Sequence, residues 1–501
     1  MSSFRRNVLT SGVERAVTAA LTLAIVPFQV WLLGIEAYGL LSFVTSLQVI
    51  CNILDLGLAP TIVREMAGDR DPDHAHGARV VQTFAALYWT VAVLLGSGLF
   101  ASAGWLAEHW LQFEGLSPAS VVLAIRLMAV SVLLRWPISL YAGAITGLQR
   151  LDLVNAIRIS TSLVRLVGGL LVLLATHSLV AYLFWLGGTA ALELATCVVV
   201  LTRLVPGVSL RPRVSWTIIG KVWHYSAHMN LISMMSVVFV QSDRLIISRF
   251  LSVTELGYYS LAYAIASGLS VVPTVLTGAL FPQFAQDLSL GKAEQVRRRA
   301  RVTAQVTMYL VAGGAGLVVV LGRDLLTWIA AASASAAYPP LVLLTVGFVL
   351  AAAVAIPYTL SIAGGETRVP LLVNLGAIGV YLPFLCGLVI VWGITGAAAA
   401  WVALNGYYLF VMVPLIRRRL PAYHAPPWFA RSVTPFLASS LVWIGGAGWL
   451  IGTGDTARAL AASALGGLLY GVLAAVFVDP GVRADLRRRL WRGVVLRGMP
   501  L

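Results

Sequence analysis

Long apolar runs separated by short polar breaks occupy most of this chain. An apolar run of about 20 residues is long enough to cross a hydrocarbon layer roughly 30 Å thick as a helix. The runs are continuous, whereas the strands of a membrane barrel would alternate over about ten residues. The pattern predicts an all-α polytopic membrane protein with about fourteen transmembrane helices. The predicted spans lie near residues 12–33, 38–62, 80–104, 119–147, 153–175, 178–202, 222–248, 257–281, 302–322, 339–363, 369–392, 395–416, 433–451 and 457–478.

Composition supports this interpretation and excludes soluble classes. Hydrophobic residues make up 59% of the 501 residues and charged residues only 11%, whereas soluble domains carry roughly 25% charged residues. The net charge is +15, but the basic residues lie between spans instead of forming one basic face, so nucleic acid is not an expected partner. With the N-terminus placed in the cytoplasm, inner junctions and termini hold 26 Lys and Arg residues and outer junctions three. This bias predicts that both termini lie in the cytoplasm.

No motif for cofactor chemistry is present. The three cysteines lie far apart within apolar runs, so neither a disulfide framework nor a zinc site is expected. The sequence contains no phosphate-binding P-loop, dinucleotide fingerprint or catalytic triad. We therefore expect no cofactor and no ATP hydrolysis; if the chain is a carrier, coupling to a proton or sodium gradient is the alternative energy source. The short outer loops argue against a membrane-embedded polysaccharide polymerase or ligase, although that alternative stays open.

A constant offset of 218 residues relates several polar junctions of the chain. Gly39 falls on Gly257 and Ser42 on Ser260, within EAYGLLS and TELGYYS. An offset of six spans preserves orientation, so it predicts a parallel repeat about an axis along the membrane normal. The expected organisation is an N-terminal lobe over 1–203, a C-terminal lobe over 204–420, and two further helices with a basic tail over 421–501.

Four segments carry a resemblance to a known family. They are FRRNVLTSG at the N-terminus, LLGIEAYGLLSF, LDLGLAPTIVREMA, and QSDRLIISRFLSVTELGYYSLA. With these segments the chain resembles the Wzx-like flippases of the polysaccharide transporter family, in the multidrug/oligosaccharidyl-lipid/polysaccharide exporter superfamily with MATE transporters and lipid II flippases. The resemblance implies two six-helix lobes around a cavity that opens alternately to each side. It also implies transport of an undecaprenyl-diphosphate-linked saccharide for O-antigen, capsule or exopolysaccharide assembly, with membrane lipids and polysaccharide assembly proteins as partners.

Arginines within the spans are the strongest candidates for substrate binding. A charge in hydrocarbon costs at least about 2.5–3.5 kcal/mol on insertion scales, so it usually faces a partner or a wet cavity. Arg135 and Arg165 each lie fifteen residues from the turn at Arg150, which places both about 22 Å along their helices. Arg126 and Arg158 extend this pair into a ladder suited to phosphate oxygens. A fifth candidate, Arg15, lies about a turn into the first span; snorkelling to an interface is the alternative for the outer members.

Intramembrane acids are candidates for ion coupling or for structural ion pairs. Burial raises the pKa of a carboxyl group, which coupling would exploit. Asp55, Glu193 and Asp243 occupy such positions. A multidrug exporter of the same superfamily would need acids to accept its cations. The arginines of the two spans around the turn at Arg150 instead favour an anionic cargo. A non-transporting scaffold is a further alternative, which the arginines disfavour.

Overall fold

The computed structural model describes most of the membrane portion of the chain. The described residues are 22, 24–53, 58–68, 75–205, 235, 237–330, 332–420, 433–451, 464–472 and 476. Their regular elements are all helices, and a single isolated bridge pairs Gln112 with Ser252. The sequence prediction of an all-α protein is therefore confirmed for the described residues.

Many of these helices could cross a membrane. Within the described residues, eight helical segments are long and apolar enough to span one, and three shorter apolar helices accompany them. The eight are Gly77–Trp110, Pro118–Gly147, Leu151–Thr176, Leu179–Leu204, Val253–Ser289, Ala293–Ala330, Ser335–Ala363 and Arg368–Arg419. The chain is thus a multi-pass membrane protein, as the apolar runs predict.

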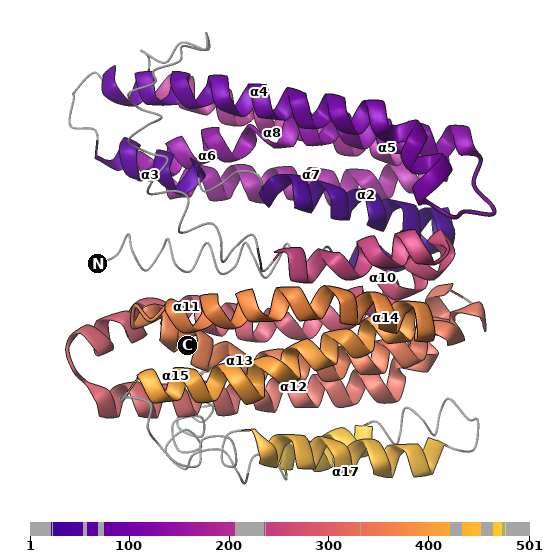
Figure 1. The fold of residues 1–501 in the computed structure, drawn as a ribbon, viewed down its shortest axis with the longest axis vertical. Helices are drawn as coiled ribbons and strands as arrows, with labels where there is room; N and C mark the ends of the chain where they lie inside the picture. Colours follow the sequence, from indigo (N-terminus) through magenta and orange to yellow (C-terminus); the bar gives the residue numbers. More distant parts are fainter. Residues whose placement is uncertain are drawn as a thin grey trace, which may run out of the picture. The chain divides into compact units, whose positions relative to one another are not determined.

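The chain divides into two compact units. Unit 1 comprises Met1–Leu261 with Ile378–Ala397, and unit 2 comprises Ala262–Ala377 with Ala398–Leu501. In unit 1 the described helices are Ala24–Leu33, α2 (Ile35–Ile53), α3 (Leu58–Ala67), α4 (Ala75–Trp105), α5 (Pro118–Arg135), α6 (Ile138–Gly147), α7 (Leu151–Thr176), α8 (Leu179–Leu204), a helix over 237–250, the first part of α10 (Val253–Ser267) and the middle of α14 (Arg368–Tyr407). A single π-helical turn, η1 (Leu106–Trp110), follows α4. Figure 1 shows α4, α5, α7 and α8 running along one another.

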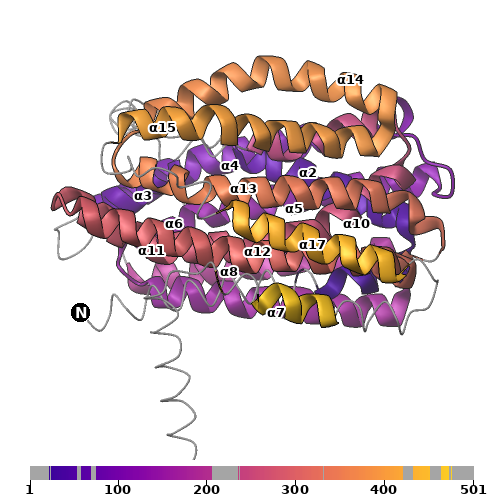
Figure 2. The same cartoon turned by 90° about the horizontal axis from the view of Figure 1, so that it is seen from below.

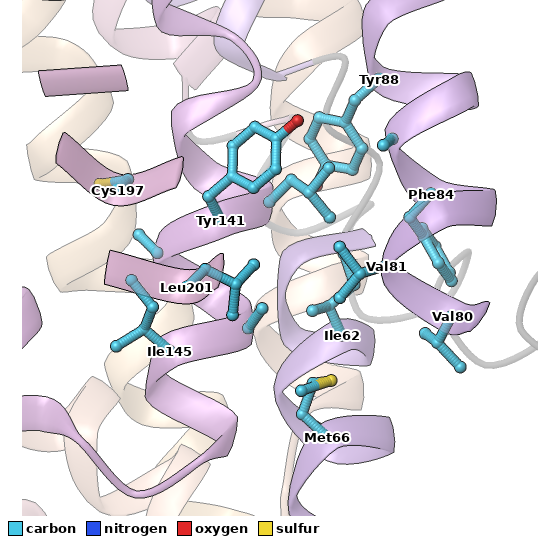
Figure 3. Packing of buried hydrophobic residues seen from close by; sticks show 14 of the residues in the cluster. Ile62, Met66, Val80, Val81, Phe84, Tyr88, Tyr141, Ile145, Cys197 and Leu201 are labelled. Carbon is cyan, nitrogen blue, oxygen red and sulfur yellow. The ribbon is translucent and has the colours of Figure 1, made fainter. Parts of the chain in front are cut away.

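An apolar cluster holds α3, α4, α6 and α8 together. Ile62 and Met66 of α3 meet Val81 and Phe84 of α4, and all four side chains are almost fully buried. Figure 3 shows Tyr141 of α6 beside the Tyr88 ring in the same cluster. Packing between membrane helices relies on such close van der Waals contact, because lipid is as apolar as the side chains.

Unit 2 is also a helical bundle. Its described helices are the end of α10, η2 (Gly268–Ser270), α11 (Val271–Ser289), α12 (Ala293–Ala330), η3 (Ala332–Ala337), α13 (Tyr338–Ala363), the two ends of α14 (Arg368–Tyr407), η4 (Tyr408–Met412), α15 (Val413–Arg419), α17 (Thr434–Ile451) and a helix over 464–472. α12 lies against α11, α13 and α17, and Figure 2 shows these helices from below.

One predicted loop proves to be helical. The basic stretch from Lys292 to Arg301 was expected to lie between spans, but α12 already begins at Ala293. Buried Val296 and Ala300 recur at helical spacing, and Arg297 forms an ion pair with Glu294 one turn earlier at 2.8 Å. An amphipathic turn thus extends the apolar span at its polar end.

Two breaks interrupt the helices, one within a predicted span and one between two predicted spans. The predicted span 119–147 divides into α5 and α6 at Pro137, whose ring cannot continue the preceding hydrogen-bond ladder. A turn at Gly393, where φ is 59° and ψ is −141°, interrupts α14. A residue with a Cβ would be strained in that conformation. This turn separates the predicted spans 369–392 and 395–416.

Residues related by the 218-residue offset contact one another within unit 1. A Cβ added at Gly39 of α2 would collide with the carbonyl oxygen of Val253, and one added at Gly257 of α10 would collide with that of Ile35. Because Ile35 and Val253 are also 218 residues apart, the two contacts are reciprocal. Such reciprocity is the pattern of a two-fold interface, in which residue i contacts j and j contacts i.

Candidate functional site

Arg135 and Arg165 lie close together in the interior of unit 1. Arg165 lies within electrostatic range of Arg135, so the structure brings these two predicted residues near each other. On α7, Arg165 lies roughly half a turn around the helix from Val167 and Leu174, two of the exposed apolar residues of that helix, at 51% and 50%. The side chains of Arg135 and Arg165 are both half-buried. Arg165 therefore points away from the exposed apolar face of α7.

Glu193 of α8 is the counter-ion of this pair. Its Oε2 atom lies 4.0 Å from Nη1 of Arg135, and the two side chains are 14% and 19% exposed. Among the described residues, the Arg135 side chain makes no hydrogen bond. The Arg165 side chain makes one long hydrogen bond, from Nη2 to Ser162 Oγ at 3.5 Å. A guanidinium carries five N–H donors. Most donors of both arginines are thus unused by the residues that the structure describes.

Tyr182 and Gln29 adjoin the arginines, although the sequence did not single them out. Gln29 Nε2 donates a hydrogen bond to the Tyr182 hydroxyl at 2.8 Å, and both side chains are buried. Tyr182 lies within electrostatic range of Arg135 and Arg165. A signal existed in the sequence, because Tyr182 precedes Glu193 by three helical turns and so shares its face.

Arg158 lies nearer the start of α7 on the same face as Arg165, seven residues before it. Its side chain is exposed, and both Arg158 and Glu193 act electrostatically on Cys197 of α8. Arg158 therefore extends the site toward the N-terminal end of α7.

Arg126 is separated from the other arginines. Its guanidinium lies 5.0 Å from the centre of the Phe100 ring, and both side chains are exposed. Nine residues separate Arg126 from Arg135, which places them on roughly opposite sides of α5. Arg126 instead shares the exposed face of Val130. The ladder expected from sequence thus divides: Arg135 and Arg165 are half-buried together, exposed Arg158 continues their face of α7, and exposed Arg126 lies on another side of α5.

The remaining candidates differ in their surroundings. Asp243 is buried at 2% exposure; one oxygen accepts the Tyr259 hydroxyl at 2.5 Å and the other accepts the backbone N–H of Arg244 at 2.7 Å. Asp243 is therefore anchored to α10. Arg15 and Asp55 lie outside the described residues. Among the described residues, no cluster of three potential metal ligands occurs.

The opposite face of the α7–α8 hairpin carries an apolar groove of 510 Å³. Phe184, Leu192 and Val164 line it with Trp185, whose indole N–H donates to the backbone carbonyl of Arg165 at 3.2 Å. Its apolar lining suits contact with lipid chains, whereas polar groups collect on the interior face.

Comparison with known families decides the classification. The model of a family described as polysaccharide biosynthesis protein matches residues 4–287, more than half of the chain. The chain belongs to this family. The resemblance to Wzx-like members of the exporter superfamily is thereby confirmed, and a curated relative agrees with it. The chain is 22% identical over 379 residues to a Shigella flexneri protein named "Putative O-antigen transporter". The alignment covers 74% of this chain and 87% of that relative.

Solved structures identify the fold. The inward closed conformation of the lipid II flippase MurJ aligns with a TM-score of 0.71 at 10% identity, covering 94% of this chain and 98% of that protein. An inward-facing multidrug resistance MATE family transporter of the MOP superfamily aligns with a TM-score of 0.66 at 12% identity, covering 83% of this chain and 99% of that transporter. At these identities the likeness shows a MurJ- and MATE-like fold.

Proposed function

We propose that this chain is a flippase that moves an undecaprenyl-diphosphate-linked oligosaccharide across the bacterial cytoplasmic membrane. The single observation that carries this proposal is the pair Arg135 and Arg165. Both side chains are half-buried within electrostatic range of each other, and most of their N–H donors are unused by the described residues. Guanidinium forks match phosphate oxygens and keep their charge at any physiological pH.

The energetic role of the pair follows from the cargo. A diphosphate loses its hydration when it leaves water, and a desolvated charge without a partner costs several kcal/mol or more. Arg135 and Arg165 replace that hydration with charge-assisted hydrogen bonds, while Glu193 is the counter-ion of Arg135 when no cargo is bound. Arg158 adds a further positive charge near the N-terminal end of α7.

Alternating access is the transport mechanism that fits such a site. In the proposed arrangement, about fourteen spans form two six-helix lobes and two additional C-terminal helices, with both termini in the cytoplasm. The offset-related contacts between α2 and α10 support an internal repeat. The family description, the name of the Shigella relative and the MurJ-like fold support a cargo for surface polysaccharide assembly. The flipped product would pass to polymerising and assembly proteins.

A transport assay with two cargo classes tests this function. The purified protein in liposomes is given a fluorescent undecaprenyl-diphosphate-linked oligosaccharide, and accessibility of the label to an outside quencher reports translocation. We expect translocation of this lipid and no efflux of a cytotoxic cation such as ethidium. Efflux of the cation without lipid translocation would instead support a multidrug exporter, the fold class of the MATE structures.

A further inference from the structure

We propose that the Tyr182 hydroxyl is a third ligand of the diphosphate beside Arg135 and Arg165, and that Gln29 holds it in the donating state. This inference rests on the proposed function and adds two residues to its site. Neither residue carries a charge, so the arginine pattern alone does not reveal them.

The hydrogen-bond direction at Tyr182 is the first step of the argument. The phenol oxygen accepts the N–H of Gln29 at 2.8 Å. A tyrosine hydroxyl that already accepts one bond still has its own O–H to donate. Among the described residues no acceptor takes that O–H, although Tyr182 is only 3% exposed. A buried donor without an acceptor is costly, so a ligand that supplies an acceptor gains by binding there.

The electrostatic setting selects the kind of acceptor. Arg135 and Arg165 both act on the Tyr182 hydroxyl, and the positive potential of two guanidinium groups favours an anion over a neutral carbonyl. The bond from Gln29 polarises the phenol and strengthens the bond that its O–H donates. Phosphate oxygens are acceptors only, which matches the donors that Arg135, Arg165 and Tyr182 present.

Packing keeps the phenol in place. Tyr182 lies near the start of α8, and a Cβ added at Gly169 of α7 would approach its ring to 2.8 Å. The ring therefore packs closely on the backbone of α7, the helix that carries Arg165. A pre-organised donor loses little conformational entropy when a ligand binds.

Tyr141 provides a matched control in the same unit. Its hydroxyl also accepts one side-chain N–H, from Trp89 at 3.2 Å, and it is also 3% exposed. It lies in the apolar cluster of α3, α4, α6 and α8 (Figure 3). Tyr141→Phe therefore removes the same atom from a comparable setting outside the arginine site.

The experiment measures binding of undecaprenyl diphosphate to the full chain in nanodiscs. We expect Tyr182→Phe to raise the dissociation constant about tenfold, the usual effect of losing a hydrogen bond to a charged group. Tyr141→Phe should leave it within twofold. Gln29→Met should weaken binding less than Tyr182→Phe and should add nothing to it, because the two residues act through one hydroxyl.

The outcomes separate this inference from the proposed function. Loss of binding in Arg135→Ala/Arg165→Ala with unchanged binding in Tyr182→Phe would overturn the role of Tyr182 alone. Unchanged binding in the arginine variant would overturn the diphosphate site itself. Thermal unfolding of each variant identifies loss of folded protein; if Tyr182→Phe fails to fold, Gln29→Met supplies the test, and its unchanged binding would contradict the inference.

Discussion

The hydroxyl oxygens of Ser42 and Ser260 lie 2.6 Å apart in a buried hydrogen bond, and the two serines are separated by 218 residues. That separation equals the repeat offset, so equivalent positions of α2 and α10 meet each other. Gly39 and Gly257 flank the serines one turn away and let the two helix backbones approach closely. The small residues suit the packing of membrane helices, where close backbone approach replaces bulky side chains.

A cysteine pair at Ser42 and Ser260 tests whether these helices separate during transport. Because the two Oγ atoms are within hydrogen-bond distance, we expect Ser42→Cys/Ser260→Cys to form a disulfide readily in an oxidant. Oxidation should stop lipid translocation and reduction should restore it, since alternating access requires one end of the cavity to open. Each single cysteine variant is the control. Full transport by the oxidised protein would show that α2 and α10 stay together throughout the cycle.

Close packing at Gly39 predicts a strong effect of one added methyl group. Gly39→Ala places a Cβ against the Val253 carbonyl oxygen, and overpacking of this kind costs about 1–3 kcal/mol. We expect a lower midpoint of thermal unfolding in detergent. Gly98→Ala is the matched control, because open space surrounds that position on α4. Equal stability of the two variants would contradict the close α2–α10 contact.

Glu36 ties the segment between η1 and α5 to α2. Its two carboxylate oxygens accept the backbone N–H groups of Glu114 and Gly115 at 2.6 and 2.9 Å. The same segment bonds to the other repeat half, where Gln112 accepts the N–H of Val253 at 2.7 Å. We expect Glu36→Gln to speed amide hydrogen exchange at residues 112–116, because a neutral amide can accept only one of the two bonds well. Glu114→Gln, which leaves both bonds intact, should leave exchange unchanged, and the same exchange rate in both variants would argue against this anchor.

Glu193 competes with the cargo for Arg135 in the proposed mechanism. We therefore expect Glu193→Gln to bind undecaprenyl diphosphate about fivefold more tightly, which corresponds to about 1 kcal/mol for a partly exposed ion pair. The control is Asp152→Asn, whose carboxylate forms an exposed ion pair with Arg150 at 3.2 Å. Weaker binding by Glu193→Gln would mean that Glu193 positions Arg135 for the ligand.

The sequence predicts the helices well because membrane helices are defined by length and hydropathy, which are local properties. Gly393 interrupts α14 between two predicted spans, and the repeat offset reappears as the contact between Ser42 and Ser260. The break at Pro137 lies inside a single predicted span, because hydropathy does not register a proline kink. The sequence prediction missed the start of α12 at Ala293, because the first turns of this helix are too polar to be recognised by hydropathy. Hydropathy also does not predict how deep in the membrane a single polar residue lies or which side of its helix it occupies.

The candidate site was harder to predict for that reason. Spacing along α5 and α7 placed Arg135 and Arg165 at one depth, and the structure brings them together. Spacing did not show which side of α5 Arg126 occupies. The structure places it over Phe100 on the exposed side of that helix. Tyr182 carries no charge, and its role emerges only from the hydrogen bond with Gln29 and the nearby arginines.

The most direct test of the diphosphate site compares two sets of arginine variants in the liposome translocation assay. Arg135→Ala/Arg165→Ala removes the two guanidinium groups of the proposed diphosphate site. Arg126→Ala removes one guanidinium group from the exposed face of α5, the helix that also carries Arg135. We predict that the double variant inserts and folds but loses lipid translocation at least a hundredfold, since two charge-assisted hydrogen-bonding groups are lost. Arg126→Ala should keep nearly normal activity. Translocation by the double variant at the rate of the Arg126→Ala protein would contradict the account.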